Sequence, residues 1–363
     1  MGFLFADAPQ RVYWELTRAC DLSCTHCRAN AIPSRHPEEL TATEVFNTLD
    51  ALAQGASPHV ILTGGDPLKR PDFLPIVAYT VHLGLPCLVA PSATTLLTKE
   101  MIGALEAHGV SAMSLSLDGS TAARHDGVRG IQGTFDRTLQ AARHIVASKI
   151  SLQINTLVTG DTQSDLPAIH ELVRKLGADR WSLFFLVTTG RGIGLKQVTP
   201  AEADAVLNFA LDHAGDERPI VTTTEAPHYR RLAVMRYSSR IEHSPKGPMI
   251  RRGLGIRDGN GVMFISHTGD VQPSGFLPLT AGNVRTENPL QIYRTSPLFQ
   301  DLRRTDRFEG RCGVCEFQEI CGGSRARAYA ATGNALGTDP LCAYEPGRAL
   351  GNLGGSRFVL GGV

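Results

Sequence analysis

Short runs typical of β-strands alternate with helical patterns between residues 11 and 186. This alternation is typical of βα units around a parallel sheet. Helix start signals support it, because Thr41 and Glu44 form a capping box and Thr199 precedes Glu202 in the same way. Because six units do not close a barrel, the predicted fold class is α/β, a partial (β/α)6 TIM-like barrel open on one side. The expected strands are Arg11–Leu16, His59–Leu62, Pro86–Ala90, Ala112–Leu117, Ser151–Val158 and Arg180–Leu186.

The pattern changes beyond this barrel, which we expect over residues 8–220. Residues 221–249 are irregular and rich in arginine, and we interpret them as a linker with partial structure. A hairpin between residues 262 and 272 is expected in a small carboxyl-terminal domain over residues 250–346. The glycine-rich residues 347–363 are predicted to be a flexible tail.

The composition is that of a soluble globular protein, with 42% apolar and 20% charged residues. A formal net charge of +1 gives no indication of a nucleic-acid partner. Residues 1–10 lack the basic and apolar pattern of a secretory signal or a membrane anchor, so the cytoplasm is the expected compartment and no membrane partner is predicted.

The eight cysteines are unevenly distributed, since seven fall in two tight clusters and only Cys87 stands alone. Clustered spacing favours metal binding over disulfides. Three thiolates near one end and four near the other suit iron–sulfur ligation better than a redox dithiol.

The first cluster has the spacing Cys-x3-Cys-x2-Cys directly after the first expected strand, at Cys20, Cys24 and Cys27. Three ligands would leave one iron of a 4Fe-4S cluster open to a small molecule. A zinc site and buried free thiols are the alternatives. Zinc usually takes a fourth cysteine or histidine, and His26 lies between the ligands, in a poor position to supply it.

This loop resembles the signature of the radical S-adenosylmethionine superfamily, Cys-x3-Cys-x-aromatic-Cys. His26 stands at the position of the aromatic residue, where a flat ring can stack near the adenine. The resemblance implies an enzyme of the oxidoreductase or lyase type with a 4Fe-4S cluster and S-adenosyl-L-methionine as cofactors. Reductive cleavage would give a 5′-deoxyadenosyl radical that takes hydrogen from the substrate, with flavodoxin or ferredoxin as the low-potential electron donor.

The same resemblance extends to loops that follow the next strands. Gly64, Gly65 and Asp66 look like the family's Gly-Gly-Glu-Pro motif, which holds the methionyl amino group, with Asp in place of Glu. Glycines let a backbone approach a ligand closely, and a carboxylate can meet an ammonium. The resemblance also places groups for the ribose and the methionine carboxylate at Ser92, Thr94, Ser116, Asp118 and Asn155. An ordinary role in a turn or a helix cap is the alternative for each of these residues and for the turn at residues 64–66.

The second cluster contains four cysteines, which could close a cluster fully or hold zinc. It resembles the SPASM or twitch extension of the same superfamily, which implies an auxiliary 4Fe-4S cluster for electron relay or structural support. Ser274 and Ser324 stand where the family often has cysteines, so we expect only one auxiliary cluster. Its predicted ligands are Cys312, Cys315, Cys321 and Cys342.

The local match over residues 322–334 is to the subgroup related to haem and haem d1 biosynthesis. That resemblance implies a tetrapyrrole substrate and oxidative decarboxylation or another modification of its propionates. Arg191 lies at the expected rim of the active site, and arginine suits carboxylates. We expect Arg325 and Arg327 to pack around the second cluster or its helix.

Two other functions remain open from the sequence. The first is radical modification of a ribosomally made peptide, which uses the same architecture, although no leader-binding domain is expected before Arg11. The second is a non-catalytic iron–sulfur electron carrier or regulator, against which the intact turn at residues 64–66 argues. His228 and Tyr229 are expected on a surface loop, and the lining of a substrate pocket is the alternative.

Overall fold

The computed structural model describes residues 4–215, 218–241 and 254–347. All six expected strands are present, and each pairs in parallel with the next along the chain. The partial α/β barrel predicted from the sequence is therefore confirmed. The strands are β1 (Arg11–Glu15), β2 (His59–Thr63), β3 (Cys87–Val89), β4 (Ala112–Ser116), β5 (Ser151–Val158) and β6 (Arg180–Phe185).

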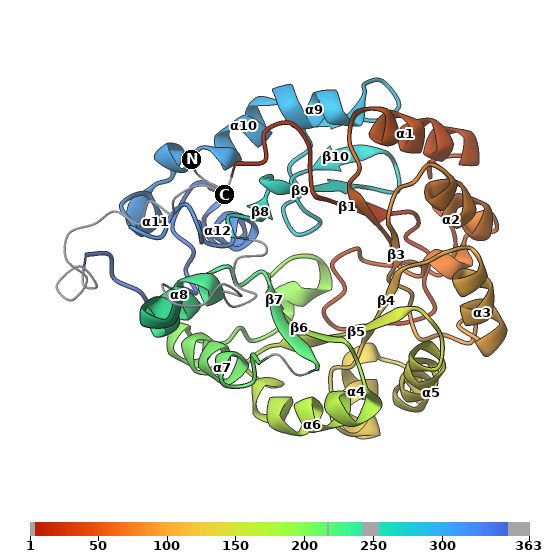
Figure 1. Ribbon diagram of the computed structural model, residues 1–363, viewed down its shortest axis with the longest axis horizontal. Coiled ribbons are helices and arrows are strands. Elements are labelled where there is room, and N and C mark those ends of the chain that lie inside the picture. Colours follow the sequence, from red (N-terminus) through yellow and green to blue (C-terminus); the bar gives the residue numbers. More distant parts are fainter. Residues whose placement is uncertain (1–3, 216–217, 242–253, 348–363) are drawn as a thin grey trace.

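Helices follow the strands and form an outer layer around the curved sheet (Figure 1). Both expected start signals form, since Thr41 and Thr199 are N-caps of capping boxes. No helix among residues 4–215, 218–241 and 254–347 is long and apolar enough to cross a membrane. The helices are α1 (Ala42–Gly55), α2 (Phe73–His82), α3 (Lys99–Ala107), α4 (Ala122–Arg129), α5 (Thr134–Val146), α6 (Leu166–Leu176) and α7 (Pro200–Asp212), with short 3-10 turns η1 (Pro67–Lys69), η2 (Gln163–Asp165) and η3 (Gly190–Gly194).

The segment predicted to be a linker is regular where it is described. Strand β7 (Ile220–Thr224) extends the sheet by pairing in parallel with β6, and α8 (His228–Ile241) follows it. The sequence analysis missed β7, although its five residues Ile-Val-Thr-Thr-Thr are all β-branched and favour a strand. The remaining linker residues, 242–249, lie outside the described residues, as does the predicted tail after Gly347.

The opposite edge of the sheet is formed by the carboxyl-terminal region. Strand β9 (Gly261–Ile265) pairs in parallel with β1 and antiparallel with β10 (Asp270–Gln272), which confirms the expected hairpin. The short strands β8 (Arg257–Asp258) and β11 (Gly282–Asn283) pair with β9 and β10. The carboxyl-terminal region and the barrel therefore share one continuous sheet, which the sequence did not predict.

The last helices lie between α1 and α8 at the edge of the open barrel (Figure 1). Helix α9 contacts α1, so this region fills the space that further βα units occupy in a closed barrel. The helices are α9 (Pro289–Thr295), α10 (Pro297–Arg303), α11 (Gly310–Gly313) and α12 (Arg325–Thr332), with the turn η5 (Thr305–Arg307).

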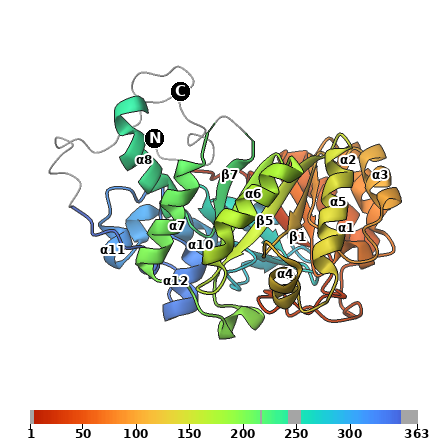
Figure 2. The same cartoon turned by 90° about the horizontal axis from the view of Figure 1, so that it is seen from below.

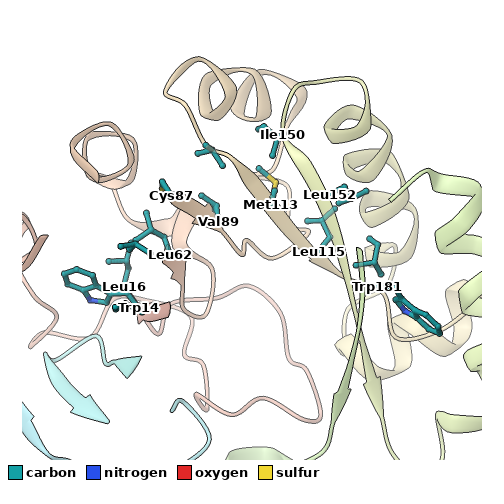
Figure 3. Packing of buried hydrophobic residues seen from close by; sticks show 14 of the residues in the cluster. Trp14, Leu16, Leu62, Cys87, Val89, Met113, Leu115, Ile150, Leu152 and Trp181 are labelled. Atoms are coloured by element: carbon teal, nitrogen blue, oxygen red, sulfur yellow. The ribbon is translucent and has the colours of Figure 1, made fainter. Parts of the chain in front are cut away.

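The main apolar core lies between the sheet and the outer helices (Figure 3). Trp14 and Trp181 are fully buried there, as the sequence indicated. Successive residues of a strand point to opposite faces, so the residues between the core positions face the barrel interior. Several of these are polar and only half-buried, including Ser114, Ser116 and Asn155. The inner face is therefore suited to a polar ligand.

Candidate active site

The first cysteine cluster lies in the loop that follows β1. Cys20 and Cys24 are buried, Cys27 is half-buried, and all three thiols are free. The three cysteines pack in one small group with Leu22 and Ala31. The loop is therefore folded so that the three cysteines of this short segment lie close together. Helix α4 lies at the lower edge of the molecule in Figure 2, and its end contacts this loop, because Ser23 N–H donates to Arg129 O at 3.2 Å.

The loop after β2 contacts the start of the cysteine loop through its backbone. Gly65 N–H donates to Thr17 O at 2.8 Å, and Asp66 N–H donates to Ala19 O at 2.7 Å. A Cβ atom added at Gly65 would lie 2.5 Å from Ala19 O, closer than real contacts allow. The two loops that the sequence assigned to the cluster and to the methionyl group are therefore in direct contact, and glycine is needed where they meet.

Asp66 is fully buried and its carboxylate is bonded inside the protein. It accepts hydrogen bonds from Leu68 N–H at 3.2 Å, Ser92 N–H at 3.4 Å and Thr94 Oγ1 at 2.8 Å. Burial raises the pKa of Asp66 to about 6. Asp66 thus joins the loops after β2 and β3, and its predicted contact with the methionyl amino group stays a prediction.

Ser92 links this pair of loops to the first cluster. Its hydroxyl donates to Gly65 O at 2.9 Å and lies 3.5 Å from the sulfur of Cys20. The structure therefore brings together five residues that the sequence placed on three separate loops. They are Cys20, Gly65, Asp66, Ser92 and Thr94.

Arg129, at the end of α4, is a site residue that the sequence analysis missed. Its guanidinium forms an ion pair with the buried carboxylate of Asp118, and its Nη1 lies 3.7 Å from the sulfur of Cys24. Burial would raise the pKa of Asp118, but the charge of Arg129 lowers it, so the carboxylate is ionised at neutral pH. The sequence held one sign of this residue's position, because Arg129 directly precedes Gly130, a glycine that ends helix α4 with φ of 72°.

His26 and Arg191 lie beside the third cysteine. Arg191 N–H donates to Cys27 O at 3.0 Å. The atoms Nε and Nη2 of Arg191 and Nδ1 of His26 are buried without a hydrogen-bond partner among the described residues. Burial lowers the pKa of His26 to about 4, so its ring is neutral at pH 7. Buried N–H groups of this kind usually have a partner, which a bound anionic group would supply.

Ser116 and Asn155 occupy adjacent positions of β4 and β5 on the inner face. The amide of Asn155 accepts a hydrogen bond from Gln153 Nε2 at 2.7 Å. No contact among the described residues joins these two side chains to the cysteine loop. Their predicted role in binding the cofactor stays a prediction.

The four cysteines of the second cluster line a pocket that is partly open to solvent. All four thiols line it, and burial raises the pKa of Cys315 to about 11 and that of Cys321 to about 12. Such thiols stay protonated at neutral pH unless a metal binds, since coordination removes the proton. Four cysteines around one cavity fit a fully ligated cluster.

Two buried arginines hold the second cluster in place, as the sequence indicated. Arg325 Nη2 lies 3.4 Å from the sulfur of Cys312, and its Nη1 donates to Gly337 O at 2.7 Å. Arg327 forms an ion pair with Asp339 at 3.3 Å. These contacts pack both arginines into the region around the second cysteine set.

The structure gives Ser324, Ser274 and His228 positions that the sequence analysis did not predict. Ser324 is the N-cap of α12, and Ser274 accepts a hydrogen bond from Phe276 N–H at 3.3 Å, so both act in local turns. His228 was expected on a surface loop, but it is fully buried in α8 and lines the second cavity. The 14-residue helix α8 places it there, and the arginine-rich sequence of this helix gave no sign of an amphipathic pattern.

Comparisons with known proteins agree with the fold and the first site. Residues 14–173 match the family model of the radical SAM superfamily. "AdoMet-dependent heme synthase" from Nitratidesulfovibrio vulgaris is 38% identical over 93% of both chains. The protein of the same name from Methanosarcina barkeri is 38% identical over 94% of this chain and 98% of the relative. "PqqA peptide cyclase" from Gluconobacter oxydans is 28% identical over 93% of this chain and 91% of the relative.

A likeness to a solved structure supports the same fold. The crystal structure of Streptococcus suis SuiB bound to S-adenosylmethionine superposes with a TM-score of 0.72 at 16% identity, covering 93% of this chain and 78% of that one.

The partial barrel with three thiols after its first strand defines an iron–sulfur enzyme of the α/β class. The chain belongs to the radical SAM superfamily. It is therefore a radical SAM enzyme, with S-adenosylmethionine and a 4Fe-4S cluster as cofactors. The neutral ring of His26 and the thiols of the first cluster fit these two groups.

Substitution of Gly65 by alanine tests the contact between the two loops. The added Cβ must displace the backbone at Ala19, so we expect the affinity for S-adenosylmethionine to fall by at least about tenfold. Gly103→Ala is the matched control, since nothing lies within 4 Å of its Cβ position. Isothermal titration of the anaerobically reconstituted proteins measures both. Equal affinities for Gly65→Ala and the wild type would show that the loop contact is unimportant.

Proposed function

We propose that this enzyme converts propionate side chains of an iron tetrapyrrole to vinyl groups by oxidative decarboxylation. The observation that carries the proposal is the 38% identity to two proteins named AdoMet-dependent heme synthase over nearly the whole chain. The buried, unpaired guanidinium atoms of Arg191 beside Cys27 support it, because a carboxylate is their natural partner.

The reaction has a fixed balance. When bound, the cluster and S-adenosylmethionine supply the 5′-deoxyadenosyl radical that accepts one hydrogen atom. Conversion of a propionate to a vinyl group releases that hydrogen atom, carbon dioxide and one further electron. The reaction therefore needs an electron acceptor in addition to the radical.

Different residues around the first cysteine set would bind the 4Fe-4S cluster and S-adenosylmethionine. Cys20, Cys24 and Cys27 would hold three irons, and the backbone of the loop after β2 would orient the methionyl group. Arg129, held by its ion pair with Asp118, lies 3.7 Å from the sulfur of Cys24 and would position this ligand. The neutral His26 ring would stack on the adenine.

The second cysteine set would hold the auxiliary 4Fe-4S cluster, the acceptor that the balance requires. Its four thiols line one cavity, and Arg231 and Arg311 also line it. Positive side chains suit a cluster whose four thiolates give it a net negative charge. Full ligation by cysteine leaves no iron open to the substrate, so we propose electron acceptance rather than structural support as its role.

We propose a low-potential flavodoxin or ferredoxin as the electron donor and the cytoplasm as the compartment. All eight cysteines are free, which supports a reducing environment.

Anaerobic turnover tests the proposed substrate. Incubation with S-adenosylmethionine, reductant and iron coproporphyrin III should give 5′-deoxyadenosine and a product that has lost carbon dioxide and two hydrogens at a propionate, detected by mass spectrometry. A ribosomal peptide is the parallel substrate. Crosslinking or hydrogen loss in the peptide with an unchanged tetrapyrrole would contradict the proposal. The absence of any 5′-deoxyadenosine would instead indicate an electron carrier.

The metal content tests the auxiliary cluster. We expect about eight irons and eight sulfides per reconstituted chain, and about four of each after alanine replaces either Cys20, Cys24 and Cys27 or Cys312 and Cys315. The second variant should still cleave S-adenosylmethionine but should not complete decarboxylation. Zinc in place of iron in the first variant would contradict an auxiliary iron–sulfur cluster.

A further inference from the structure

We propose that Arg28 forms a carboxylate-binding subsite on the inner face of the barrel and binds a propionate of the substrate there. The inference rests on the proposed tetrapyrrole function and assigns a recognition role to a residue outside the cofactor-binding set. Arg28 directly follows the last cysteine of the first cluster, so its side chain begins next to the reacting centre.

The two side chains that contact the Arg28 guanidinium lie on the inner face. Glu15 ends β1, and Phe264 lies in the middle of β9, which pairs with β1. Their neighbours Trp14, Met263 and Ile265 all belong to the outer core. Because successive residues of a strand point to opposite faces, Glu15 and Phe264 face the interior of the barrel.

The guanidinium is held on one edge and on one face. Arg28 Nη2 donates to Glu15 Oε2 at 2.8 Å, and the Arg28 Cζ atom lies 4.7 Å from the centre of the Phe264 ring. The other oxygen of Glu15 is 2.8 Å from Nδ1 of His267. Burial would raise the pKa of Glu15, but Arg28 and His267 lower it, so the ion pair is maintained at neutral pH. These contacts fix the orientation of the guanidinium before a ligand arrives, which reduces the entropy lost on binding.

The remaining donors of Arg28 are available to a ligand. An arginine has five N–H groups, and the bond to Glu15 is the one hydrogen bond that this guanidinium makes within the described residues. Its side chain is 20% exposed although its partner Glu15 is buried. Gly275 packs beside the guanidinium, since a Cβ there would lie 3.2 Å from Cζ of Arg28, so its lack of a side chain makes room for the arginine itself. An open edge of a planar fork is the geometry that binds a carboxylate through two hydrogen bonds.

Both the substrate and S-adenosylmethionine carry carboxylates, and the position of Arg28 favours the substrate. Ser92 and Arg129 approach the cysteine loop from the β2 to β4 side, where they contact Cys20 and Cys24, and Arg191 approaches it from the segment after β6. Arg28 instead lies against β1 and β9, at the junction of the barrel and the carboxyl-terminal region. A substrate that reaches across the open barrel would pass this junction.

Binding measurements with the full-length, cluster-loaded enzyme test the proposal. The dissociation constants of iron coproporphyrin III and of its tetramethyl ester are measured by absorbance titration, and that of S-adenosylmethionine by calorimetry. In Arg28→Gln we expect the free acid to bind at least about tenfold more weakly, the preference for acid over ester to shrink, and the cofactor affinity to stay unchanged. Arg28→Lys should recover only part of the acid affinity, since lysine lacks the fork.

Arg285→Gln is the matched control, because Arg285 makes an ion pair of the same length, 2.8 Å, with Glu44. That pair links helix α1 to the segment after β11, away from the inner face. An Arg28→Gln enzyme with the wild-type preference for acid over ester would overturn the subsite, as would one that loses cofactor affinity alone. If the wild type binds neither tetrapyrrole, the proposed function fails instead, and the two failures are thereby separated.

Discussion

The packing of the cysteine loop against the backbones of neighbouring loops determines the geometry of the active site. Gly65, Gly130 and Gly190 come from three different segments, and a Cβ at each would collide with a carbonyl oxygen of the cysteine loop. Gly130 and Gly190 also have φ values of 72° and 55°, which favour glycine. Because these contacts join main chain to main chain, they fix the three thiols relative to the surrounding strands more tightly than side-chain contacts could.

The second constraint is the continuous sheet that joins the two cysteine clusters. Strand β9 of the carboxyl-terminal region pairs with β1, directly before the first cluster. At the other edge, Arg327 donates to Leu186 O at 3.4 Å and to Glu225 O at 2.7 Å, and it pairs with Asp339 near Cys342. The second cluster is thus held to both edges of the open barrel. This arrangement suits a reaction in which an electron leaves the substrate for a second centre at a fixed position.

The sequence predicted what depends on local pattern and missed what depends on partners distant in the chain. Six strands, two capping boxes and the β9–β10 hairpin carry their signals within a few residues, and the structure confirms them. The pairing of β9 with β1 has no local signal, because it joins segments far apart in the chain. The same distinction holds at the site. Cysteine spacing identified both clusters, whereas the roles of Arg129 and Arg28 depend on Asp118 and Glu15, which lie in other elements.

The chemistry of this enzyme depends on the first three thiols, which would hold an iron–sulfur cluster with one iron open to S-adenosylmethionine. Electron paramagnetic resonance of the reduced protein tests it most directly, in a Cys312→Ala, Cys315→Ala variant that leaves only the first set intact. We predict a 4Fe-4S signal whose shape changes when S-adenosylmethionine is added. A signal that is identical with and without the cofactor, or a first site filled by zinc, would contradict the account.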